Sequence, residues 1–151
     1  MAARDRIPPT SLILGIGAMC PIILAAVAAW TIPERTASLA VQAACVWAGS
    51  ILAFLGGARR GLSFRGYDDA TWGELASSGW LFGLGLLALF LPWTVASLAL
   101  LVVGYLSVGV LDPAAARSGQ APAFFARLRP MQAAIAVTGL LGLAAFVLAQ
   151  K

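Results

Sequence analysis

Long apolar runs separated by short polar segments dominate the sequence and predict membrane-spanning helices. A spanning helix needs about 20 mostly apolar residues. Within each run the apolar residues follow one another without the alternation typical of a spanning strand. The pattern therefore predicts an all-α integral membrane protein, a bundle of about five transmembrane helices. The expected spans are residues 9–32, 36–58, 72–91, 93–111 and 130–149.

Several residues mark the expected helix ends. Pro9 suits the first turn of a helix, where a missing N–H costs nothing, and Pro130 is expected to open the last helix in the same way. Thr71 and Glu74 have the spacing of a capping box. Pro21 falls inside the first span, where it should free a carbonyl group and bend the helix.

The third and fourth spans are joined almost without a polar break. As one helix, residues 78–111 would be roughly 50 Å long, well beyond a hydrocarbon core of about 30 Å. We therefore expect a tight hairpin turn at Pro92 and Trp93, with Trp93 at the membrane interface.

Basic residues are divided unevenly between the two expected ends of the bundle. Five spans leave only Arg35 and Lys151 on one side, whereas a single helix over residues 72–111 would divide the basic residues about six to four. Cytoplasmic loops carry an excess of Lys and Arg. The N-terminus is therefore expected in the cytoplasm and the C-terminus outside. The basic residues expected in the cytoplasm are Arg4, Arg6, Arg59, Arg60, Arg65, Arg117, Arg127 and Arg129.

This orientation gives the first testable prediction. Alkaline phosphatase fused after Lys151 is expected to be active, and a fluorescent protein at the same position dark, because both would lie outside the cytoplasm. A C-terminus found in the cytoplasm would contradict five spans, and the expected turn at Pro92 would be the first assignment to revise.

Composition supports a membrane location over a soluble one. The chain of 151 residues is 61% hydrophobic and only 11% charged, against about 25% charged in ordinary soluble domains. Residues 1–151 are expected to form one transmembrane domain. The net charge of +4 follows from arginines between apolar runs, so membrane topology explains it better than nucleic-acid binding does.

No residue pattern points to a catalytic, cofactor or metal site. The sequence has no histidine, which excludes His-ligated haem, copper and zinc sites and His-dependent nucleophiles. Cys20 and Cys45 lie in separate apolar runs and fit buried core residues. They lie on neighbouring expected helices, an arrangement that would allow the two side chains to touch. The sequence leaves open whether they form a disulfide.

Small residues form the clearest packing pattern. Ridges of small residues let membrane helices approach closely. We expect them to pack inside one bundle; homodimerisation or docking of a partner helix is the alternative. The helix-packing candidates are Gly49, Ala53, Gly56 and Gly57 in the second span, and Gly79 and Gly83 in the third.

Charged residues gather at the expected cytoplasmic ends of three spans. Asp112 is expected to pair with an arginine there, leaving the other guanidinium groups for an anionic lipid headgroup or a partner's carboxylate. Ordinary flanking arginines that snorkel to the interface are the alternative. The phenylalanines of residues 123–129 would insert among acyl chains. The candidate contact residues are Arg59, Arg60, Asp112, Arg127 and Arg129.

Three blocks of sequence resemble the family of small membrane proteins with domain of unknown function 3429, which includes transmembrane protein 69. The blocks are residues 15–21 (GIGAMCP), residues 50–61 (SILAFLGGARRG) and, after Leu111-Asp112, residues 119–129. The sequence departs from the family pattern at Arg60, where tryptophan is usual, and at Phe124-Phe125, where Trp-Tyr is usual. The resemblance implies a topology and an inner-membrane location, bacterial or mitochondrial, but no reaction.

Three classes of function fit these features. The favoured one is a non-enzymatic accessory or assembly protein of the inner membrane, associated with a respiratory or other membrane complex. The second is a small carrier for a lipid-like or uncharged solute; no charged residue falls near the middle of a span, which argues against ion pumps. The third, a lipid-headgroup enzyme, would depend on Asp68, Asp69, Glu74 or Asp112.

Overall fold

The structure is a computed structural model that describes residues 6–65, 71–92 and 94–150. The expectations above for Arg4, Asp68, Asp69, Trp93 and Lys151 lie outside the described residues, as does the side chain of Arg65.

The described chain is helical, and five segments are long and apolar enough to cross a membrane. The first of them is interrupted, so six α-helices and one short 3-10 helix make up the fold. This confirms the predicted all-α membrane protein with five spans. The elements are α1 (Pro9–Gly17), α2 (Cys20–Thr31), α3 (Glu34–Leu62), η1 (Ser63–Arg65), α4 (Trp72–Phe90), α5 (Thr94–Arg117) and α6 (Phe125–Ala149).

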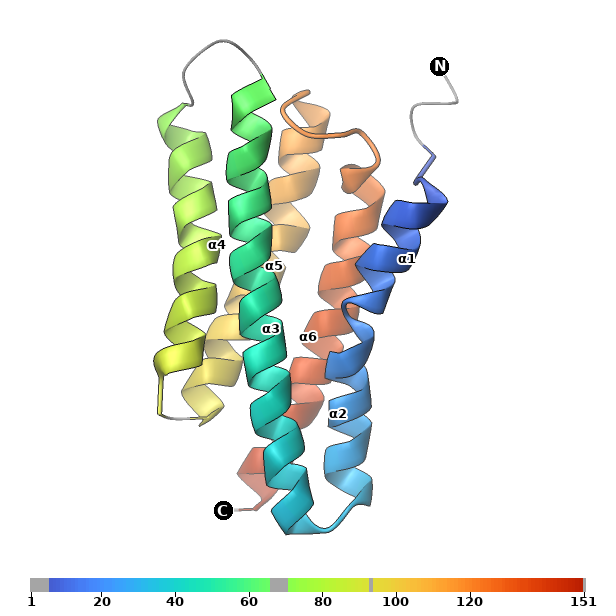
Figure 1. The fold of residues 1–151 in the computed structure, drawn as a ribbon, viewed down its shortest axis with the longest axis vertical. Coiled ribbons are helices and arrows are strands. Elements are labelled where there is room, and N and C mark those ends of the chain that lie inside the picture. Colours follow the sequence, from blue (N-terminus) through green and yellow to red (C-terminus); the bar gives the residue numbers. More distant parts are fainter. Residues whose placement is uncertain (1–5, 66–70, 93, 151) are drawn as a thin grey trace.

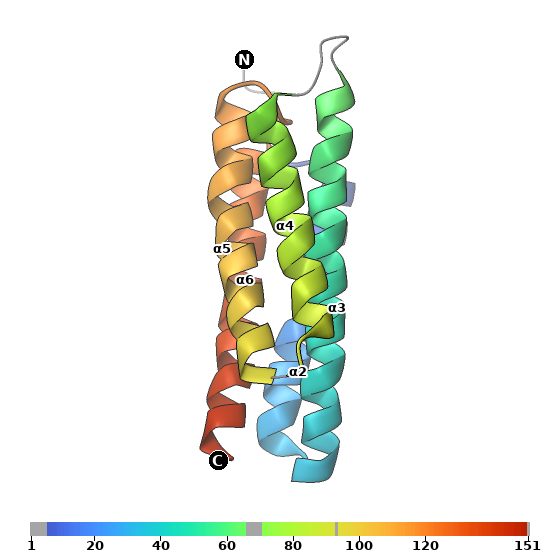
Figure 2. The same cartoon turned by 90° about the vertical axis from the view of Figure 1, so that its left-hand side faces the viewer.

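The helices form a closed ring in the order of the chain. α2 packs on α3, α3 on α4, α4 on α5 and α5 on α6, and α6 returns to α2. From α2 to α6, helices that follow one another in the chain are antiparallel, whereas α2 and α6 run in the same direction (Figures 1 and 2). α1 begins at one end of the bundle and α6 finishes at the other, as an odd number of spans requires (Figure 1).

Most of the predicted helix ends are confirmed, and three are wrong. The second span was expected to end at residue 58, but α3 continues to Leu62. Thr71 and Glu74 form the capping box at the start of α4, and the chain turns back between α4 and α5 at Pro92. However, α5 does not end at Leu111 but continues through Pro113. Likewise Pro130 does not open α6 but lies inside it. A proline removes a single helical hydrogen bond, and the packing of α5 against α6 keeps both helices continuous.

The first span breaks where Pro21 lacks its N–H. α1 ends at Gly17, and the Ile22 N–H donates to the Met19 carbonyl instead of the Ala18 carbonyl one residue earlier. The indole Nε1 of Trp47 donates to that freed Ala18 carbonyl at 2.8 Å. α2 then packs on α3 and α6, while α1 contacts α6 and α2 only sparsely and leans away from the line of α2 (Figure 1).

Leucine and alanine fill the interior of the ring, and large apolar side chains face outward. Leu52, Leu98 and Leu140 are fully buried, whereas Ile13 and Phe90 are 71% and 80% exposed, as expected for contact with lipid. Both thiols are free, with Cys20 exposed and Cys45 buried.

A Cβ atom built on each predicted packing glycine would either meet atoms of a neighbouring helix or find open space. At Gly56 it would lie 2.6 Å from the Phe82 backbone nitrogen, and at Gly49 2.9 Å from Leu89 Cδ2. Gly85, which the sequence did not single out, would place it 2.7 Å from the Ala53 backbone nitrogen. The α3–α4 interface therefore needs these glycines. The expected close packing inside the bundle is wrong for three residues, Gly57, Gly79 and Gly83, which have open space around them.

Candidate functional site: an arginine–aspartate cluster at one end of the bundle

Three helices bring charged side chains together at the end of the bundle where α3 and α5 finish and α6 begins. Arg59 lies in the last turn of α3, Asp112 lies near the end of α5, and Arg129 lies early in α6. The antiparallel ring places these three positions at a similar depth. We call these three residues the ion cluster, and the end of the bundle that carries them the arginine end.

Asp112 uses both carboxylate oxygens within the ion cluster. Arg59 Nη1 donates to Oδ1 at 2.6 Å. Arg129 Nε lies 2.9 Å from Oδ2, an ion-pair contact outside hydrogen-bond geometry. The predicted pairing of Asp112 with an arginine is thus confirmed, and the structure extends it to two arginines.

Neutral polar side chains complete the surroundings of the cluster. Arg59 Nε donates to Ser77 Oγ at 2.7 Å, which ties the cluster to α4. Arg129 Nη1 donates to Gln132 Oε1 at 3.0 Å, and its guanidinium carbon lies 4.3 Å from the centroid of the Phe125 ring. Four helices therefore meet at this end through polar contacts.

The cluster is buried and carries unbalanced charge. Asp112 is 5% exposed and Arg129 is 8% exposed, whereas Arg59 is part-buried, with 13% of its side chain exposed. Two guanidinium groups against one carboxylate leave a net charge of +1 where water is scarce. A buried charge without full compensation is costly, so a nearby anion would stabilise this end. Glu74 of α4 lines the same small cavity as Arg59.

The predicted contact residues therefore fall into two sets. Arg59 and Arg129 each contact Asp112 and donate to one neutral side chain, so only part of their N–H donors remain for an outside ligand. Arg127 is exposed. Arg60 donates to Ser63 Oγ at 2.7 Å and lies over the Phe64 ring. Arg60 and Arg127 form the outer basic pair.

Sequence reasoning missed Gln132 and Ser77. Gln132 follows Arg129 by one helical turn, the spacing at which side chains meet, and it is polar within an apolar run. That signal was available in the sequence. Ser77 has no comparable signal, because its role depends on which face of α4 meets α3.

A crevice opens beside the ion cluster between α1, α3 and α6. It has a volume of about 240 Å³ and is lined mainly by apolar side chains, with Arg129 and Gln132 on the α6 wall. It exists because α1 diverges from the bundle at the break near Ala18.

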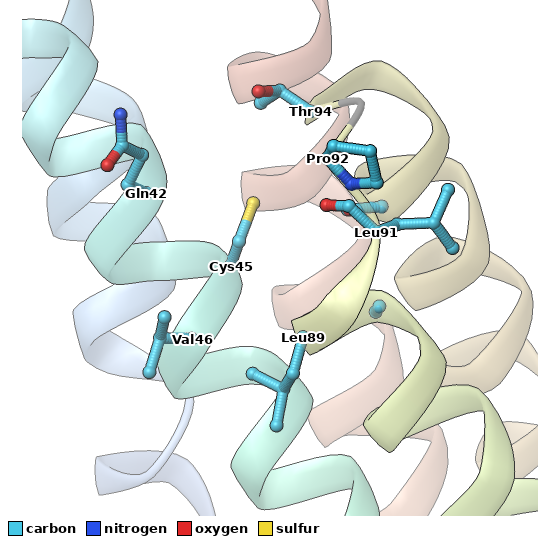
Figure 3. A pocket seen from close by; sticks show the side chains of 9 residues that line it. Gln42, Cys45, Val46, Leu89, Leu91, Pro92 and Thr94 are labelled. Atoms are coloured by element: carbon cyan, nitrogen blue, oxygen red, sulfur yellow. The ribbon is translucent and has the colours of Figure 1, made fainter.

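Two further hollows lie away from the cluster. A shallow apolar furrow between α4 and α5 includes Ala76 and Trp80. At the opposite end a cavity of about 290 Å³ lies where α4 stops beside the longer α3. Figure 3 shows the Cys45 sulfur pointing into this cavity, between Gln42 and Thr94. Among the described residues, no group of three or more Cys, Asp or Glu side chains is placed to hold a metal ion.

Comparison with known proteins identifies the family. The model of a family described as "Protein of unknown function (DUF3429)" matches residues 7–145. The chain belongs to this family. No curated protein and no solved structure gives a significant match. The match covers all five spans except the last residues of α6, and it includes the ion cluster and the outer basic pair, so these features lie inside the domain that defines the family.

Proposed function

We propose that this member of the DUF3429 family is a non-enzymatic accessory or assembly protein of an inner membrane, whose arginine end holds an anionic group of a lipid or of a partner membrane protein. The membrane would be the bacterial cytoplasmic membrane, or the mitochondrial inner membrane in a eukaryote, and the partner a respiratory or other membrane complex. The observation that carries the proposal is the net positive, buried ion cluster, flanked by the outer basic pair of Arg60 and Arg127.

The geometry of the ion cluster favours binding of an anionic group over catalysis. The Asp112 carboxylate, which a hydrolytic reaction would need as a base, has both oxygens engaged by guanidinium groups. Such pairing holds the carboxylate in place between α3 and α6. The described interior of the ring is filled by apolar side chains, which favours an accessory protein over a carrier with a polar path.

The test removes charge from the outer basic pair. The double variant Arg60→Gln and Arg127→Gln is expected to insert and fold, because neither residue contacts Asp112. A basic residue near an anionic membrane surface contributes about 1 kcal/mol, so losing two should weaken retention of an anionic lipid or partner about thirtyfold. Purification in mild detergent followed by mass spectrometry of the co-purifying lipids and proteins measures this effect.

Arg35→Gln is the matched control, since it removes an exposed arginine from the opposite end of the bundle. Its set of bound lipids and proteins should equal that of the wild type. If the double variant also keeps the wild-type set, the outer arginines are ordinary interface-flanking residues and the proposal fails.

A further inference from the structure

The crevice between α1, α3 and α6 has a polar end and an apolar end. On the α6 wall it runs from Phe124 to Gln132, which corresponds to about 12 Å along a helix. Its polar side chains are Arg129 and Gln132 on α6 and Ser11 on α1, while Ala18 and Ile51 line it further toward the middle of the bundle. The polar side chains therefore lie in the half of the crevice near the arginine end, together with Phe124 and Phe125, and the half toward the middle of the bundle is apolar.

Two donors at the polar end are poorly satisfied within the chain. Arg129 is 8% exposed. Among the described residues it makes a single side-chain hydrogen bond, from Nη1 to Gln132, while its buried Nε contacts Asp112 as an ion pair. Gln132 accepts from Arg129 through Oε1, so its Nε2 remains a donor. This Nε2 lies toward α1, because a Cβ atom built on Gly15 would come within 2.6 Å of it. Gly15 thus leaves room for the amide on the wall of the crevice.

We propose that an anionic phospholipid occupies this crevice, with its phosphate against Arg129 and Gln132 and one acyl chain between α1 and α3. The inference rests on the proposed function, since it names the anion that offsets the net +1 charge of the ion cluster. A phosphate carries several acceptors for guanidinium and amide donors.

The size and position of the crevice favour a lipid over a protein segment. A helix with its side chains is about 10–12 Å across, too wide for a crevice of about 240 Å³. The apolar wall includes Phe54, which is 68% exposed on the outside of the bundle. The crevice is therefore open to the bilayer, and an acyl chain can enter it from the side. Trp47 donates a hydrogen bond to the carbonyl of Ala18, a residue that lines the crevice.

The experiment compares two crevice variants with two matched controls. Gln132→Met removes the amide donor, and Ala18→Leu fills the apolar end. Gln42→Met makes the same exchange at the opposite end of the bundle, and Ala76→Leu enlarges an alanine in the α4–α5 furrow. Each purified protein is mixed with equal amounts of phosphatidylglycerol and phosphatidylcholine that carry identical acyl chains. Native mass spectrometry then counts the retained lipids, and circular dichroism shows which variants are folded.

The wild type and both controls are expected to retain one phosphatidylglycerol in preference to phosphatidylcholine. Loss of a hydrogen bond to a charged group corresponds to about tenfold in affinity, so Gln132→Met should reduce this occupancy by about that factor. Ala18→Leu, which leaves the ion cluster untouched, should reduce it as well. Equal retention of the two lipids by the wild type, or wild-type retention by a folded crevice variant, overturns the inference.

The outcomes also separate this inference from the proposed function. If the preference for phosphatidylglycerol survives both crevice variants but is lost in the Arg60→Gln and Arg127→Gln double variant, the lipid binds at the outer basic pair and only the crevice is wrong. If the wild type shows no preference and co-purifies with no partner, both proposals fail.

Discussion

Replacing Asp112 with asparagine is expected to lower the free energy of unfolding by about 3–5 kcal/mol, the usual cost of removing one partner from a buried ion pair. The loss should be large because the variant leaves Arg59 and Arg129 facing each other across a buried site with no carboxylate between them. Titration with a denaturing detergent, followed by circular dichroism, measures the change. Glu34→Gln is the control, since Glu34 is exposed at the opposite end.

A triple variant tests whether unpaired charge, rather than altered packing, causes this loss. Arg59→Met, Asp112→Leu and Arg129→Met together replace the ion cluster by apolar side chains of similar length. Exchange of a buried ion pair or triad for well-packed apolar residues is often neutral or stabilising, so the triple variant should recover most of the lost stability. An Asp112→Asn protein as stable as the wild type would contradict the structural role of the cluster.

The sequence contained enough information for the spans and for the existence of the cluster. Continuous apolar runs predict spans without any knowledge of tertiary contacts, and helices that finish at one membrane interface must place their terminal charges at a similar depth. Asp112 is an acidic residue among arginines at that depth, which was sufficient to predict its pairing. The number of arginines that share it was not predictable, because the last helix was expected to begin at Pro130, whereas α6 begins at Phe125 and includes Arg129.

The choice of packing face could not be predicted in the same way. α4 has large apolar residues on every side, so its sequence does not distinguish the face that meets α3 from the face that meets lipid. The spacing of Gly79 and Gly83 shows only that these residues share a face. In the structure that face is exposed, and Ser78 and Gly85 lie at the contact with α3 instead.

The crevice between α1, α3 and α6 could not be predicted from the sequence either. Pro21 predicts a bend in the first span, but neither its direction nor its extent. The hydrogen bond from Trp47 to Ala18 and the divergence of α1 depend on contacts between helices that are distant in the chain. Gln132, although recognisable as a polar residue in an apolar run, acquires its position on the crevice wall only through this arrangement.

Gly85→Ala is expected to destabilise the protein, whereas Gly83→Ala, the same exchange two positions earlier in α4, is not. A Cβ at residue 85 would lie 2.7 Å from both the Ala53 nitrogen and the Gly49 carbonyl oxygen. These are backbone atoms of α3, so relief requires the two helices to separate. Overpacking of this kind costs about 1–3 kcal/mol. The same detergent titration measures both variants.

Residue 83 is the matched control because a Cβ there meets nothing within 4 Å. Alanine favours a helix over glycine by roughly 0.5–1 kcal/mol, so Gly83→Ala should be as stable as the wild type or more so. The two exchanges alter helix propensity equally and differ only in what the new methyl group meets. Equal stability of the two variants would therefore show that α3 and α4 do not approach at Gly85, and a loss confined to Gly83→Ala would place the close contact on the opposite face of α4.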